Sequence, residues 1–113
     1  MIKIYHNNRC SKSRSALKLL HESGKPVEII NYLEHIPSVK ELTKIIKLLK
    51  IKPIELVRKN EAIWKENFKN QEFSDKELID IMIKNPKLIE RPIVINDNKA
   101  TIGRPPERVV DII

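Results

Sequence analysis

Cysteine is almost absent from this chain, since Cys10 is the only one among 113 residues. A single cysteine excludes an intramolecular disulfide and therefore a disulfide-stapled secreted module. It also excludes zinc sites built from several cysteines, and we expect no metal. No apolar run approaches the roughly 18 residues of a membrane span, and the first residues lack the apolar stretch of a signal peptide. We therefore expect a cytoplasmic protein without a membrane association.

Aromatic residues are also scarce, at 4%, although the formal net charge is +7. A nucleic-acid-binding protein would cluster its positive charge and interleave aromatic side chains for stacking. The lysines here are instead scattered at helical spacing, which is typical of a solvated surface. Nucleic-acid binding is therefore not indicated, whereas an electropositive site for a small anion stays open. The length suits one domain, 1–113, and we expect a monomer.

The hydrophobic pattern predicts an α/β fold. Alternating residues and stop signals indicate a strand, a helix and a parallel strand within about 30 residues, which is a βαβ unit. Capping boxes at Ser38 and Ser74 open helices of a helical insertion at about 38–85. A hairpin and a last helix carrying Val109, Val110 and Ile113 complete a mixed four-stranded sheet flanked by helices. The expected strands are 1–5, 27–30, 92–95 and 99–102, and the expected helices follow Cys10, Ser38, Pro53, Asn60, Ser74 and Pro105.

Cys10 lies where the first strand passes into the first helix. The free amides and dipole of a helix that begins at Ser11 would stabilise a thiolate, as would nearby cations such as Arg14, and both would lower the thiol pKa from about 8.5. The alternative is a small buried apolar residue, the commonest state of a lone cysteine. The polar surroundings favour a reactive thiolate. His6 and Arg14 are weak candidates from their spacing alone.

A lone reactive thiol needs a second thiol from outside the chain to complete a redox cycle. Ser13 occupies the position that a second cysteine holds in the C-x-x-C motif of dithiol oxidoreductases. The reductant would therefore be a small thiol such as glutathione, or a protein such as glutaredoxin. Neither is expected to be a bound cofactor.

Five segments together resemble the glutaredoxin-coupled arsenate reductase (ArsC) family, which has a thioredoxin-like fold. The resemblance covers essentially the whole chain, and the motifs stand in the family's order and spacing. The family commonly has proline where this chain has Asn8, followed here by Arg9. The segments are Ile4–Asn7 with Cys10–Arg14, Tyr32–Glu34, Leu56–Glu61, Leu88–Val94 and Ile102–Glu107.

The resemblance implies an enzyme that reduces arsenate to arsenite. The cysteine that matches Cys10 attacks arsenate, glutathione joins the adduct, and glutaredoxin resolves it. Arginine suits the oxyanion because its planar, permanently charged fork matches oxyanion geometry. By motif, the anion-binding arginines are Arg58, Arg91 and Arg104.

Further positions take supporting roles by the same resemblance. His6, Ser13 and Arg14 match positions that support the thiolate and the anion. Pro92 is expected to be cis and to start the third strand beside the cysteine turn.

Two other functions remain open from the sequence alone. A general glutathione-dependent thiol reductase would need Cys10 but not the three arginines. A regulator similar to the Spx proteins, which bind RNA polymerase, would normally use a C-x-x-C switch, and Ser13 removes its second cysteine.

Overall fold

The computed structural model describes all residues, 1–113. The chain forms two compact units, which we describe separately. One contains residues 1–35 and 91–113, and the other contains residues 36–90. The helical segment expected at about 38–85 lies within the second unit.

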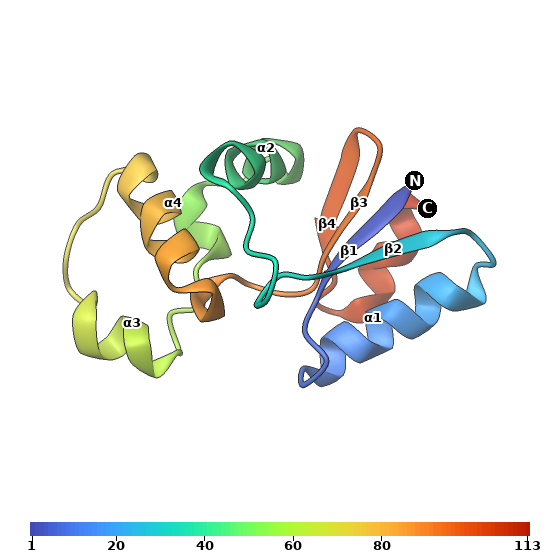
Figure 1. Ribbon diagram of the computed structural model, residues 1–113, viewed down its shortest axis with the longest axis horizontal. Coiled ribbons are helices and arrows are strands. Elements are labelled where there is room, and N and C mark those ends of the chain that lie inside the picture. The colour runs from blue at the N-terminus through green and yellow to red at the C-terminus, as the bar shows by residue number, and fades with distance from the viewer. The chain divides into compact units, whose positions relative to one another are not determined.

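The first unit is built on a four-stranded mixed sheet with the strand order β2-β1-β3-β4 (Figure 1). β1 is parallel to β2 and antiparallel to β3, and β3 and β4 form an antiparallel hairpin. The βαβ unit and the hairpin are therefore as the sequence predicts. The strands are β1 (Ile2–His6), β2 (Val27–Asn31), β3 (Ile93–Asn96) and β4 (Lys99–Ile102).

Two helical elements share one hydrophobic core with this sheet. They are helix α1 (Ser11–Glu22) and the 3-10 helix η3 (Pro106–Ile112). Successive side chains of a strand alternate between faces, so Ile2 and Ile4 of β1 point to the same side. The core comprises Ile2, Ile4, Ala16, Leu20, Val94 and Val109, all of them buried.

The last element differs in detail from the expectation. Val109 is fully buried, but Val110 is 54% exposed. Because a 3-10 helix has three residues per turn, side chains at i and i+3 eclipse, so Val109 shares its face with Ile112 rather than with Val110. Ile112 and Ile113 pack against the core.

The second unit is helical. Ser38 and Ser74 cap two of its helices, and their hydroxyls accept hydrogen bonds from the backbone amides of Glu41 and Glu77. The Glu77 carboxylate also accepts from the Ser74 amide at 2.8 Å, which completes a capping box. The elements are α2 (Val39–Leu49), η1 (Pro53–Leu56), α3 (Ala62–Asn67), α4 (Asp75–Lys84) and η2 (Pro86–Leu88).

The expected α/β architecture with a mixed four-stranded sheet is therefore confirmed. No helix of the chain is both long enough and apolar enough to cross a bilayer.

Candidate active site

Cys10 lies at the junction between β1 and α1. It is the N-cap residue of α1, has extended backbone angles and is 8% exposed. Its carbonyl accepts from the amide of Arg14 at 3.0 Å, while its own amide donates to the carbonyl of Asn7 at 3.1 Å. The first amides of the helix are therefore directed towards the Cys10 side, where a helix N-terminus favours negative charge.

The C-terminal half of the first unit brings two arginines towards this junction. The Arg91–Pro92 peptide bond is cis, and so is the Arg104–Pro105 bond. The Gly103 amide donates to the Pro92 carbonyl at 2.9 Å, and the Arg104 guanidinium lies 3.4 Å from the Arg91 carbonyl oxygen. The segment before β3 and the segment after β4 are therefore held together.

Gly103 is the residue that permits this close approach. A Cβ at this position would lie 2.9 Å from Cγ of Pro92, 3.2 Å from Cγ1 of Val109 and 3.4 Å from Cβ of Ala16. Only a residue without a side chain fits between the Pro92 ring and the core.

The pKa of the Cys10 thiol is lowered from its ordinary value. Burial is the largest single influence and raises the pKa, because it disfavours the charged form. The backbone amides of Ser13 and Lys12 and the positive charges of Arg91 and Arg104 act in the opposite direction and together prevail. The structure therefore assigns the activating charges to two arginines distant in sequence, rather than to Arg14 beside the cysteine.

His6 and Ser13 form a buried hydrogen-bonded pair behind the cysteine loop. His6 is even-numbered like Ile4, so it lies on the face of β1 that α1 covers. Its Nδ1 lies 2.6 Å from the Ser13 hydroxyl oxygen, and this oxygen also accepts from the Asn7 amide at 3.1 Å. Both His6 and Ser13 are buried, at 4% and 0% exposure. The pair therefore ties the end of β1 to the first turn of α1.

The surroundings of His6 favour its neutral form. Its pKa is lowered mainly by burial; a hydrogen bond to the Asn8 side chain opposes this, and the Arg14 charge adds to it. A neutral imidazole can accept at Nδ1 from the Ser13 hydroxyl, which leaves the proton on Nε2.

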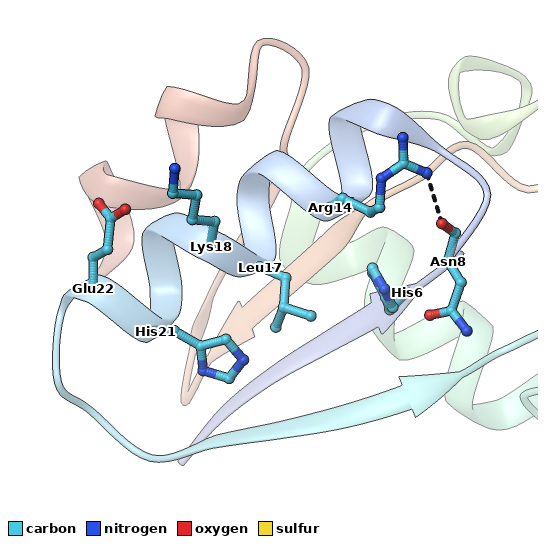
Figure 2. Close-up of a pocket in the computed structure, with 7 residues that line it drawn as sticks. All are labelled: His6, Asn8, Arg14, Leu17, Lys18, His21 and Glu22. Carbon is cyan, nitrogen blue, oxygen red and sulfur yellow. Dashed lines mark hydrogen bonds between the residues drawn. The ribbon is translucent and has the colours of Figure 1, made fainter.

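Arg14 holds the loop that precedes Cys10. Its guanidinium donates to the Asn8 carbonyl at 2.8 Å (Figure 2). The Arg9 amide donates to Oδ1 of Asn7 at 3.0 Å. The loop is therefore held by hydrogen bonds although Asn8 replaces the proline common in the family. Asn7 and Asn8 were not among the predicted site residues, although asparagine favours turns and could have indicated this role.

Arg58 belongs to the second unit. Its guanidinium forms an ion pair with Glu61 at 3.3 Å and donates to the Lys87 carbonyl at 3.0 Å. Its amide donates to the Leu88 carbonyl at 2.7 Å, next to the bridge between Val57 and Ile89. Arg58 is thus fixed within its own unit, and its role at an anion stays a prediction.

These features define the class of protein to which the chain belongs. A mixed four-stranded sheet, a cysteine at the N-terminus of the first helix and a cis-proline before the third strand together form a thioredoxin-like thiol site. The chain belongs to the ArsC family, whose model matches residues 5–112.

Individual relatives agree with this membership. The chain is 46% identical to the uncharacterized protein YfgD of Escherichia coli over 99% of this chain and 96% of that protein. It is 45% identical to the arsenate reductase of Haemophilus influenzae, over 97% of each chain. The solved structure of the arsenate reductase from Vibrio cholerae superposes with a TM-score of 0.94 at 43% identity, over 99% of this chain and 97% of that one.

Proposed function

We propose that this protein is an arsenate reductase that uses Cys10 as its nucleophile. The observation that carries the proposal is the position of Cys10 at the N-terminus of α1, where the amides of Ser13 and Lys12 and the charges of Arg91 and Arg104 lower the pKa of its thiol. A thiolate is the nucleophilic form of cysteine. Two cations beside it also suit a multiply charged oxyanion, because arginine binds such anions through paired hydrogen bonds. The arsenate reductases among the relatives support this choice of substrate.

The reaction has four steps. The Cys10 thiolate attacks arsenic and displaces one oxygen, which leaves as water after it is protonated. A glutathione thiol displaces a second oxygen as water, so that arsenic carries both sulfurs. A glutaredoxin thiolate then attacks the glutathione sulfur, forming a glutathione–glutaredoxin disulfide. The two electrons of the broken arsenic–sulfur bond reduce As(V) to As(III), and water releases arsenite from Cys10.

The remaining predicted residues take supporting roles in this scheme. Arg58 is the third proposed anion-binding arginine. His6 and Ser13 position the first turn of α1, whose Ser13 amide stabilises the thiolate. Arg14 holds the loop at Asn8. Pro92 shapes the segment that carries Arg91.

We place the protein in the cytoplasm, acting as a monomer with glutathione as co-substrate and glutaredoxin as partner. A lone free thiol suits a reducing compartment.

The test is steady-state arsenate reduction with glutathione, glutaredoxin and NADPH-coupled regeneration of glutathione. The wild type should turn over and Cys10→Ser should not. Equal turnover in Cys10→Ser, or none in the wild type, would contradict the proposal. Turnover of a glutathione mixed disulfide that is indifferent to Arg91→Ala and Arg104→Ala, without arsenate reduction, would instead support a general thiol reductase.

A further inference from the structure

The turn that leads into Cys10 is held by hydrogen bonds and not by a proline. It comprises residues 7–10, and its closing bond runs from the Cys10 amide to the Asn7 carbonyl at 3.1 Å. Neither of its central residues, Asn8 and Arg9, has a positive φ, which fits a type I turn. A proline at the second position of such a turn would fix φ at about −65°. Asn8 occupies that position, so the backbone of this turn lacks that restraint.

Asn7 supplies a restraint from the first position of the turn. Its carbonyl accepts from the Cys10 amide, and its amide donates to the Ser13 hydroxyl oxygen at 3.1 Å. Its side-chain Oδ1 accepts from the Arg9 amide at 3.0 Å. Almost any residue could form the two backbone bonds, whereas the third needs a short side chain with an acceptor oxygen, such as that of asparagine, aspartate or serine. The identity of residue 7 therefore matters through Oδ1.

The turn determines how Cys10 enters α1. Cys10 is the N-cap residue of this helix, with φ −93° and ψ 119°. The side chain of an N-cap residue lies beside the amides two and three residues further on, which here belong to Lys12 and Ser13. The same two amides lower the pKa of the Cys10 thiol. A loosened turn would release Cys10 from its extended conformation and let its sulfur move away from these amides.

We propose that Asn7 is a positioning residue for Cys10: its Oδ1 bond to the Arg9 amide holds the turn so that the Cys10 sulfur faces the first amides of α1. The Arg14 guanidinium holds the same turn from the helix side, through its bond to the Asn8 carbonyl (Figure 2). The inference rests on Cys10 as the proposed nucleophile and not on arsenate as the substrate.

Two variants that differ by one oxygen atom test this role. Asn7→Ala removes the acceptor, whereas the hydroxyl of Asn7→Ser can still accept from the Arg9 amide. Alkylation of Cys10 by iodoacetamide, measured against pH, reports the thiolate. Below the thiol pKa, Asn7→Ala should react about two- to tenfold more slowly than the wild type, which corresponds to the loss of one hydrogen bond, and its pH profile should shift upward. Asn7→Ser should keep most of the wild-type rate. The matched control, Asn98→Ala in the exposed β3–β4 turn, should leave the rate unchanged.

A proline at position 8 gives an independent test, because its ring should replace the restraint that Oδ1 supplies. The Asn8 amide donates no hydrogen bond within the chain, so Asn8→Pro removes none of the backbone bonds of the turn. In an Asn8→Pro background, Asn7→Ala should therefore slow alkylation less than it does in the wild type. A wild-type rate in Asn7→Ala, equal rates in Asn7→Ala and Asn7→Ser, or the same loss in both backgrounds would overturn the inference.

Hydrogen exchange of the wild-type protein decides the question if Asn7→Ala does not fold. After correction for intrinsic rates, the Arg9 amide should exchange more slowly than the Asn8 amide, because only the former donates a hydrogen bond. Equal exchange of the two amides would contradict the role of Oδ1. None of these measurements needs arsenate, so a wild type that does not reduce arsenate would count against the proposed function alone.

Discussion

Gly103→Ala tests whether the approach of two segments to Cys10 creates the reactive thiol. The added Cβ would meet the Pro92 ring at 2.9 Å and Val109 at 3.2 Å, and neither neighbour is the end of a flexible side chain. Overpacking of this kind costs about 1–3 kcal/mol. In a chain of 113 residues, each kcal/mol lowers Tm by about 4 °C, so we expect a fall of about 4–12 °C.

The same substitution should change the chemistry. Relief of the clash moves the Gly103 segment away from Pro92 and carries Arg104 with it, so less positive charge faces Cys10. The pKa of the Cys10 thiol should rise, which ultraviolet absorbance of the thiolate against pH would measure.

Gly24→Ala is the matched control for this prediction. Gly24 has φ +76° and no neighbour within 4 Å, so alanine there carries only backbone strain of about 1–2 kcal/mol. The control should lose stability without a change in the thiol titration. An unaltered Cys10 titration in Gly103→Ala, despite the loss of stability, would refute the reasoning.

Three further predictions concern other contacts. Arg91→Lys keeps the charge but loses the paired hydrogen bonds, so the KM for arsenate should rise about ten- to a hundredfold while Cys10 alkylation continues; unchanged kinetics would remove Arg91 from the site. The folded state binds fewer protons than the unfolded state below about pH 6.5, because the pKa of buried His6 is lowered, so the free energy of unfolding should fall as pH falls from about 7 to about 5. Urea denaturation should show a smaller fall in His6→Gln. An equal fall in both proteins would argue against this role of His6. Ser74→Ala removes the cap of α4 and should cost about 1 kcal/mol in thermal unfolding, with no effect on the thiol.

The arrangement of the strands was accessible from the sequence because local patterns encode it. Alternation at Ile2 and Ile4, the Asp97–Asn98 turn and the serine caps each act within a few residues, and the structure has the corresponding elements. The type of the last helix was not accessible. Two prolines and a short apolar pattern suit an α-helix and a 3-10 helix alike, and only packing on the core separates Val109 from Val110.

The candidate site likewise contains residues that the local sequence predicts and residues that it does not. Cys10 was predictable as a candidate nucleophile because a cysteine between a strand and a helix start lies beside free helix amides, which stabilise a thiolate. Arg91 and Arg104 were chosen by resemblance, since nothing local distinguishes them from surface arginines.

The lowered pKa of the Cys10 thiol thus depends both on its own segment and on the pairing of the sheet. Residues 1–35 contain the thiol, the helix amides and the His6–Ser13 pair, and burial in that segment raises the pKa of the thiol while its amides lower it. The two arginines that add their charge to the amides arrive only when β3 pairs with β1 and Gly103 meets Pro92. The stability of the fold and the lowered pKa of the Cys10 thiol therefore depend in part on the same contact, and a change at that contact is expected to alter both together.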